Sequence, residues 1–238
     1  MKTETQEAQS KGLLGDRLTR HGTPVIAWIS LFCAAGSLSL ILLEGLSETL
    51  RLGGWIFCGA LWLFALNFFR NPRRMAPAGD QPISPADGKV IGVDLVDDES
   101  YVDGRALRIH IFLSVFNVHV NRIPVDGVIE HLRYVEGEFR SAVGAEAREV
   151  NERQEIGLMS SDGVPILVRQ IAGLIARRIV CPLKVGDEVK RGFDFGMIRF
   201  GSQTEIIIPS RDGIPFKSTV KVGDKVQGGK TVLGDWIK

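Results

Sequence analysis

The sequence predicts a mostly β protein in which a two-helix membrane hairpin precedes a compact β barrel or sandwich domain. Residues 25–43 and 52–69 contain no charged side chain, and each run is about as long as a membrane span. From residue 83 onward, short apolar runs rich in β-branched residues alternate with Gly, Asp and Pro, a pattern typical of strands and turns. Convincing long amphipathic helical patterns do not occur in this part of the sequence. We therefore expect a membrane hairpin at 25–69 and a β domain at 83–238.

The N-terminal segment, residues 1–24, is polar, and the apolar run that follows it is 19 residues long. A helix of that length spans about 28 Å, which is close to the thickness of the hydrocarbon core of a bilayer. The connector between the two runs carries Glu44, Glu48 and Arg51, whereas basic residues, among them Arg74, flank the outer ends. Because flanking basic residues favour the cytoplasmic side and act as topology determinants, we expect both termini in the cytoplasm.

Two other interpretations of the apolar runs stay open. A cleaved signal peptide competes for the first run, although the run is long for such a segment and a second apolar run follows it. The second run is short and contains glycine, so a re-entrant or interfacial hairpin is also compatible with it. Under either hairpin interpretation, the β domain is held against a bilayer surface.

The linker at 70–82 is rich in Pro and Gly, which end the second helix and begin a new domain near residue 80. Eight runs of this domain have the composition of strands. These candidate strands are residues 89–96, 105–113, 126–135, 155–160, 164–171, 175–181, 195–199 and 204–208. Residues 139–149 are the least strand-like stretch, and we interpret them as a loop or a short helix.

Two short patterns recur within the β domain. Residues 85–91 (PADGKVI) are echoed at 124–129 (PVDGVI), and residues 184–192 (KVGDEVKRG) are echoed at 221–229 (KVGDKVQGG). The second pattern resembles the turn-strand unit of lipoyl- and biotinyl-type β-hammerheads, in which Gly-Asp makes the turn and Val packs on either side. Two copies of such units fit one compact barrel or sandwich, and they are too few for a solenoid.

The composition argues against several classes of site and partner. The net charge of +1 provides no overall field for nucleic acid or another polyanion. The three cysteines, Cys33, Cys58 and Cys181, form neither a CxxC motif nor a cluster with histidine. We therefore expect no disulfide framework, no metal site and no nucleic-acid partner.

A Gly201-Ser202 pair opens the β-branched run at 204–208. Glycine lets the backbone adopt unusual dihedral angles, and serine places a hydroxyl beside the preceding carbonyl carbon. On the local pattern alone, such a pair is most often a turn before a strand. It also contains the minimum that a serine needs to attack its own upstream peptide bond.

Two further residues are candidates for acid–base chemistry. His119 lies where an apolar strand gives way to a turn crowded with polar groups, and an imidazole suits proton transfer near neutral pH. A packed histidine explains the same local pattern. Asp87 is a candidate carboxylate, but Asp-Gly is usually a turn, and Asp126-Gly127 uses the same dipeptide.

Four motifs, taken in order, resemble a known family. They are SPADGKV at 84–90, FLSVFNVHVNRIP at 112–124, RQIAGLIARRIV at 169–180 and FGMIRFGSQTEIIIP at 195–209. Together they closely resemble the short, membrane-associated phosphatidylserine decarboxylase proenzymes, from about residue 64 to the C-terminus, and the apolar hairpin fits as well. The resemblance favours a scissile bond at Gly201-Ser202 over a simple turn.

The resemblance implies that the Ser202 hydroxyl attacks the carbonyl carbon of Gly201 and that the chain is cut between them. The products would be a β chain of residues 1–201 and an α chain of residues 202–238. Ser202 would become a covalent pyruvoyl group whose carbonyl system accepts the electrons released as carbon dioxide leaves. The enzyme would then need neither pyridoxal phosphate nor a metal ion.

By the same resemblance, His119 is the base that activates Ser202 and later the acid in decarboxylation, and Asp87 orients it. Longer relatives carry a second histidine three positions after the first, whereas this sequence has Arg122 there. Either His119 covers both tasks or another residue assists it. Arg122 is interpreted as a ligand for the lipid phosphate or the substrate carboxylate, or as a solvated loop arginine.

The implied function is conversion of phosphatidylserine to phosphatidylethanolamine and carbon dioxide at the inner membrane, with the catalytic domain on the cytoplasmic face. A homo-oligomer paired through edge strands is compatible with the sequence. Two alternatives stay open. One keeps the chemistry but acts on an archaeal-type serine ether lipid. The other is a non-catalytic, lipoyl-like adaptor tethered to the membrane, in which Gly201-Ser202 is only a turn.

Overall fold

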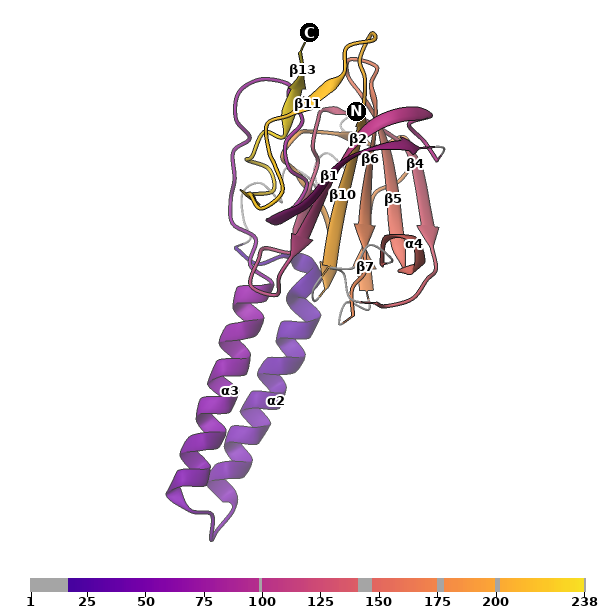
Figure 1. The fold of residues 1–238 in the computed structure, drawn as a ribbon. Coiled ribbons are helices and arrows are strands. Elements are labelled where there is room, and N and C mark those ends of the chain that lie inside the picture. The colour runs from indigo at the N-terminus through magenta and orange to yellow at the C-terminus, as the bar shows by residue number, and fades with distance from the viewer. Residues whose placement is uncertain (1–16, 99, 141–146, 175–177, 200–201, 238) are drawn as a thin grey trace. The chain divides into compact units, whose positions relative to one another are not determined.

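A computed structural model of the 238-residue chain describes residues 17–98, 100–140, 147–174, 178–199 and 202–237. The chain divides into two compact units. One lies within Asp16–Pro72 and is helical, and the other starts at Arg73 and is mostly β (Figure 1). The predicted fold class, a mostly β domain preceded by two apolar helices, is therefore confirmed.

The helical unit consists of a 3-10 turn and two long helices. Their bounds are η1 (Arg20–Gly22), α2 (Thr23–Leu42) and α3 (Glu48–Phe68). Helix α3 begins about one turn before the uncharged run at 52–69, because the Ser47 hydroxyl accepts a hydrogen bond from the backbone N–H of Leu50 (3.4 Å) and caps it. A hydrogen bond links the two helices, in which the indole N–H of Trp62 donates to the Ser30 hydroxyl (3.0 Å). Both helices are long and apolar enough to span a membrane.

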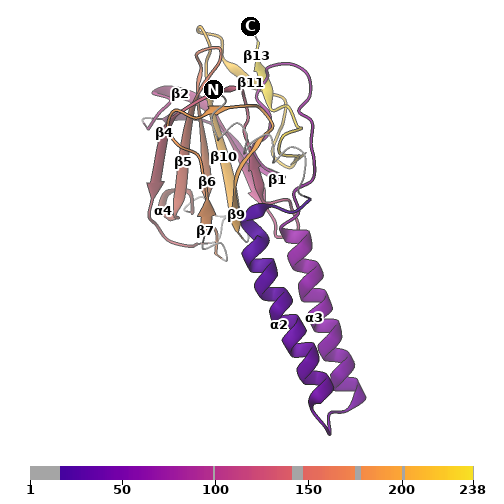
Figure 2. The same cartoon turned by 180° about the vertical axis from the view of Figure 1, so that it is seen from behind.

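The β unit is built on one large antiparallel sheet that curls into a half-barrel (Figures 1 and 2). Its strand order is β12-β1-β2-β10-β6-β5-β4-β8, and two small sheets, β3-β9-β7 and β11-β13, accompany it. The bounds are β1 (Gly88–Asp98), β2 (Gly104–Leu113), β3 (Val120–Arg122), β4 (Gly127–Val135), α4 (Ala147–Val150), β5 (Arg153–Ser160), β6 (Pro165–Ile171), β7 (Arg178–Val180), β8 (Glu188–Val189), β9 (Asp194–Arg199), β10 (Ser202–Pro209), β11 (Phe216–Ser218), β12 (Lys225–Val226) and β13 (Gly234–Trp236). Each candidate strand corresponds to one of these, although residues 175–177 of the sixth candidate lie outside the described residues.

The inner face of the half-barrel forms the main hydrophobic core. Alternate residues of a strand point to the same face, so Ile109 and Ile111 of β2 pack in one buried cluster with Ile206 and Ile208 of β10. Phe195 of β9 joins the cluster and shows that the small three-stranded sheet contributes to it. Because burial of one such side chain contributes about 2 kcal/mol, this face supplies much of the stability of the β unit.

The two sequence echoes form equivalent pairs of strands at the two edges of the large sheet. Strand β12 pairs with the start of β1, and β8 pairs with the start of β4. In the first pair Gly88 lies opposite Val226, and in the second pair Gly127 lies opposite Val189. Strands β12 and β8 therefore form the two opposite edges of the sheet.

The aspartates that precede these glycines make the same backbone contact. Asp87 Oδ1 accepts a hydrogen bond from the N–H of Gly228 (2.8 Å), and Asp126 Oδ1 accepts one from the N–H of Arg191 (2.7 Å). The repeated Asp-Gly is thus one structural device, in which a carboxylate fastens a strand start to the chain that follows an edge strand. The two aspartates differ in their ion pairs: Asp87 has a buried arginine partner, Arg74, whereas Asp126 has an exposed lysine partner, Lys190.

Part of the linker is bound to the β unit. Arg191 donates from Nε and Nη1 to the carbonyl oxygens of Gln81 and Pro77 (2.9 and 2.7 Å). Arg74 forms an ion pair with Asp87. Because of these contacts, the compact β unit starts within the predicted linker and ahead of its first strand.

Gly88 marks a close approach of two strands. A Cβ at this position would stand 2.2 Å from the carbonyl oxygen of Phe112. We expect Gly88→Ala to lower the free energy of unfolding by about 3 kcal/mol, because backbone must move to admit the methyl group. Gly59→Ala is the control, since apart from its chain neighbours and the backbone of its own helix no atom lies within 4 Å of the added Cβ. Thermal unfolding in detergent measures both variants, and equal melting temperatures would contradict the close approach.

Candidate active site

Ser202 is the first residue of β10, at an end of the large sheet. It lies opposite Leu113, the last residue of β2, and its neighbour Gln203 lies opposite Ile171, the last residue of β6. Because side chains alternate along a strand, Ser202 shares the inward face of β10 with the core residue Ile206. The sheet therefore positions Ser202 at the inner rim of the half-barrel.

The Ser202 side chain is fully buried, and its hydroxyl oxygen has no hydrogen-bond partner among the residues that the structure describes. Burial of a hydroxyl without a partner costs free energy, so such groups call for an explanation. Gly201, the other half of the predicted scissile bond, lies outside the described residues.

A buried asparagine, Asn121, connects three segments around this serine. Its Nδ2 donates to the carbonyl oxygen of Pro85 (3.3 Å) and to the hydroxyl of Thr204 (3.1 Å), and its Oδ1 accepts from Nε2 of Gln170 (2.9 Å). Asn121, Thr204 and Gln170 are all fully buried. Buried, connected hydrogen bonds make a rigid network in a low dielectric.

The Asn121 network brings the predicted site segments together. Asn121 itself and two of the residues that it contacts stand two positions along the chain from the predicted site residues His119, Asp87 and Ser202. Asn121 was not predicted as a site residue from the sequence. The only indication there is that a polar residue stands within an otherwise apolar strand segment.

His119 lies immediately before β3, with its side chain fully buried. Its Nδ1 stands 3.0 Å from the backbone carbonyl oxygen of Asn117. Because a carbonyl only accepts, Nδ1 carries the proton and Nε2 is the basic atom of the neutral imidazole. The Asn117 side chain accepts from the backbone N–H and the hydroxyl of Ser114 (2.9 and 2.7 Å), which holds the turn. This geometry suits a general base.

Asp87 is buried and has an arginine as its partner. Arg74 forms a two-pronged ion pair with it, from Nη1 to Oδ1 and from Nη2 to Oδ2, the second at 2.8 Å. Such paired hydrogen bonds fix the plane of a carboxylate. Arg74 therefore contacts a predicted site residue, in addition to being one of the basic residues that follow the second apolar run. The contact with Asp87 is apparent only from the tertiary structure. The orientation of His119 by Asp87 stays a prediction.

Arg122 is buried rather than solvated, with 6% of its surface exposed. Its Nη1 donates to the carbonyl oxygen of Gly192 (2.9 Å). Desolvation lowers the pKa of Arg122, and the charge of Arg74 lowers it further, while the charges of Asp194 and Asp87 oppose both effects. Two arginines and two aspartates thus form a charge-balanced group beside the Asn121 network.

A second buried histidine, His110, lies on the other face of the sheet. Its Nδ1 is 2.9 Å from Oε1 of Glu205, and its Nε2 is 2.6 Å from Oδ1 of Asp94. Glu205 points outward because it alternates with the inward-facing Ser202 and Thr204 along β10. The sheet therefore separates His110 from the Ser202 hydroxyl.

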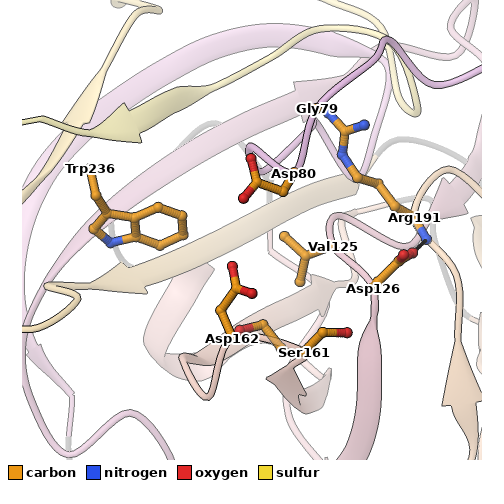
Figure 3. Close-up of a pocket in the computed structure, with 9 residues that line it drawn as sticks. Gly79, Asp80, Val125, Asp126, Ser161, Asp162, Arg191 and Trp236 are labelled. Carbon is orange, nitrogen blue, oxygen red and sulfur yellow. Dashed lines mark hydrogen bonds between the residues drawn. The ribbon is translucent and has the colours of Figure 1, made fainter.

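A pocket of about 140 Å³ lies elsewhere in the β unit (Figure 3). It is lined by Gly79, Asp80, Val125, Asp126, Ser160, Ser161, Asp162, Arg191 and Trp236. Asp126 is held by the backbone of Arg191, and Asp162 forms an ion pair with Arg211 (3.2 Å). Asp126 of the second Asp-Gly copy lines this pocket, and none of the predicted site residues does.

Comparison with known proteins agrees with the motifs. The phosphatidylserine decarboxylase family model matches residues 61–234. A protein of Desulfotalea psychrophila named phosphatidylserine decarboxylase proenzyme is 39% identical over 226 residues, which cover 92% of this chain and 97% of the relative. Proteins of the same name from Carboxydothermus hydrogenoformans (49% over 179 residues, 73% of this chain and 80% of the relative) and Chlorobium luteolum (39% over 220 residues, 92% and 100%) are also similar.

The family model covers the β unit from its start to residue 234, and two of the relatives match 92% of the chain. The three segments that Asn121 joins lie inside the region matched by the family model. The chain belongs to the phosphatidylserine decarboxylase family.

Proposed function

We propose that the chain is a proenzyme that cuts itself between Gly201 and Ser202 and then converts phosphatidylserine to phosphatidylethanolamine and carbon dioxide. The observation that carries the proposal is the buried Ser202 hydroxyl, whose oxygen has no hydrogen-bond partner among the described residues. A hydroxyl that no structural contact holds is available to the neighbouring carbonyl carbon. The relatives' shared name, which includes the word proenzyme, supports a chain that is processed after synthesis.

Cleavage begins when the Ser202 Oγ gives its proton to a base and attacks the carbonyl carbon of Gly201, so that the amide becomes an ester. As the peptide C–N bond breaks, the base passes that proton to the nitrogen of residue 202, which becomes an amine. The base, neutral again, then removes the α-proton of residue 202, the Cβ–Oγ bond breaks, and the chain 1–201 leaves with a carboxylate terminus. A dehydroalanine remains at the start of residues 202–238. Its hydrolysis consumes water, releases ammonia and leaves a pyruvoyl group.

His119 is the base in this proposal. The backbone oxygen of Asn117 holds its proton on Nδ1, which leaves Nε2 to receive a proton. Asp87 supplies a fixed negative charge that stabilises the imidazolium as it forms, and Arg74 keeps that carboxylate in one orientation. The Asn121 network supports the spacing that this transfer needs.

The pyruvoyl group supplies the electron-accepting carbonyl that decarboxylation needs, so neither pyridoxal phosphate nor a metal ion takes part. After carbon dioxide has left, His119 holds the proton that the substrate carbon receives. We keep Arg122 as the candidate ligand for the lipid phosphate or the substrate carboxylate, because a guanidinium group binds such groups in a two-pronged manner.

The apolar helices α2 and α3 hold the protein in the cell membrane in this proposal. Their charge pattern, with basic residues at the outer ends and Glu44 and Glu48 at the connector, favours a β unit on the cytoplasmic face. A substrate that resides in the bilayer needs an enzyme held at the bilayer surface, so a membrane anchor suits this reaction.

The decarboxylase activity is tested with carboxyl-labelled phosphatidylserine in vesicles. We expect release of labelled carbon dioxide, with phosphatidylethanolamine as the product. No release from fully processed protein would contradict the activity.

We expect His119→Gln to slow self-cleavage by a factor of about 10² to 10⁴, the usual contribution of a positioned base. Glutamine keeps a donor near the Asn117 carbonyl but has no basic nitrogen. The fraction of cleaved chain is followed over time by gel electrophoresis after synthesis in a cell-free system. His131→Gln is the control, because His131 lies in β4 and contacts none of the site segments among its described contacts. Cleavage of His119→Gln at the wild-type rate would remove His119 from the mechanism.

A further inference from the structure

Two exposed apolar residues follow the strands on either side of β10, the strand that begins at Ser202. Strand β2 ends at Leu113 on one side of β10, and β6 ends at Ile171 on the other side. Three residues beyond these ends stand Phe116 and Leu174, whose surfaces are 71% and 65% exposed. A single exposed apolar residue needs no explanation. Here, however, two large ones follow the two strands that pair with β10, at the end where β10 begins with Ser202.

An arginine pair lies at the same end. Arg178 of β7 stands directly opposite Arg199 of β9, and Arg199 is three residues before Ser202. Like charges that are directly opposite in an antiparallel pair repel each other. Desolvation lowers the pKa of Arg199, and the charge of Arg178 lowers it further. An anionic group beside the pair stabilises both charges.

We propose that Phe116, Leu174, Arg178 and Arg199 form a docking surface, here called the rim patch, for an anionic phospholipid bilayer. The apolar side chains enter the interface, and the two arginines contact lipid phosphates or carboxylates. Charge complementarity selects an anionic bilayer, because it offers apolar depth and negative charge together. The rim patch rests on the proposed function and deepens it: the lipid headgroup reaches Ser202 through this face without leaving the bilayer.

Depth-dependent quenching in the full chain tests the rim patch directly. In a variant whose native cysteines (Cys33, Cys58 and Cys181) are replaced by alanine, a fluorophore is attached to Leu174→Cys. The matched control carries it at Val185→Cys, in the turn before the edge strand β8, where Val185 is 63% exposed. In vesicles of phosphatidylglycerol and phosphatidylcholine with brominated acyl chains, we expect quenching several times stronger at position 174. Equal quenching at the two positions would overturn the rim patch.

A kinetic comparison gives the second test. The double variant Phe116→Ser/Leu174→Ser is compared with Leu95→Ser/Val185→Ser, two exposed apolar residues away from Ser202. We expect kcat/KM for phosphatidylserine in vesicles to fall about tenfold in the first variant only. With a short-chain phosphatidylserine dispersed below its micelle concentration, both should match wild type. An equal loss on both substrates, or no loss on vesicles, would overturn the rim patch.

The arginine component is tested by charge. Arg178→Gln should reduce the rate on vesicles rich in phosphatidylglycerol and leave the rate on phosphatidylcholine-rich vesicles close to wild type. Arg105→Gln, exposed at the opposite end of β2, should change neither rate. Equal effects of the two substitutions would overturn the contribution of the arginine pair. If wild-type protein is inactive on both vesicle and dispersed substrate, the proposed function fails instead, and the quenching result still decides the rim patch.

Discussion

Ser202→Ala is expected to leave the protein as a single chain of 26.1 kDa, with no decarboxylase activity. Alanine removes the nucleophile for the first step and also the atoms from which the pyruvoyl group would form. The variant should fold, because the Ser202 hydroxyl has no hydrogen-bond partner among the described residues, and its removal leaves no new buried group unpaired. Electrophoresis of denatured protein measures whether the variant is cleaved, and thermal unfolding measures whether it folds.

Thr204→Val is the matched control for this substitution. Thr204 lies two residues further along the same face of β10, and valine preserves its shape while it removes the hydroxyl that Asn121 contacts. We expect cleavage to continue, more slowly, because the network is weakened but the nucleophile remains. Complete loss of cleavage in Thr204→Val, or persistent cleavage in Ser202→Ala, would show that the nucleophile is wrongly assigned.

The second large effect is expected from Asp87→Asn. Asparagine keeps an oxygen for the N–H of Gly228 but removes the charge that balances Arg74. Because both partners are largely buried, leaving one charge uncompensated should cost about 3–5 kcal/mol of stability. Self-cleavage should slow as well, since the proposed His119 imidazolium loses its stabilising carboxylate.

The internal repeat provides the control for this variant within the same chain. Asp126→Asn makes the same chemical change at the second copy of the device, where the backbone contact is also retained. Asp126 is about half exposed and its ion pair with Lys190 is 3.7 Å long, so its loss should cost less than about 1 kcal/mol. Chemical denaturation and cleavage kinetics of both variants make the comparison. Equal losses would mean that Asp87 serves only as a strand fastener.

Much of the fold could be predicted because it rests on local patterns. Uncharged runs of sufficient length gave the two helices, and β-branched runs between turn residues gave the long strands. The short strands β8 and β12 were not predicted as strands, because two residues carry no periodicity. Their positions were nevertheless marked by the repeated Lys-Val-Gly-Asp pattern, which forms equivalent edges of one sheet.

The site could be predicted only in part. The motifs containing Asp87, His119 and Ser202 were found from the sequence, and the Asn121 network joins the segments that carry them. The pairing of Arg74 with Asp87 and the contact of Asn117 with His119 were not predicted. Both depend on how the chain returns in three dimensions, and a basic residue beside an apolar helix has an equally good explanation in membrane topology.

Cleavage between residues 201 and 202 is the central proposal, and it is tested by the mass of the denatured wild-type protein. We expect two chains, of which the smaller, residues 202–238, has about 4 kDa, its proportionate share of the 26.1 kDa precursor. Its N-terminus should resist Edman degradation and react with a carbonyl reagent such as a hydrazide, because it carries a ketone instead of an amine. A single uncut chain of 26.1 kDa after prolonged incubation with membranes would show that the chain does not cleave itself.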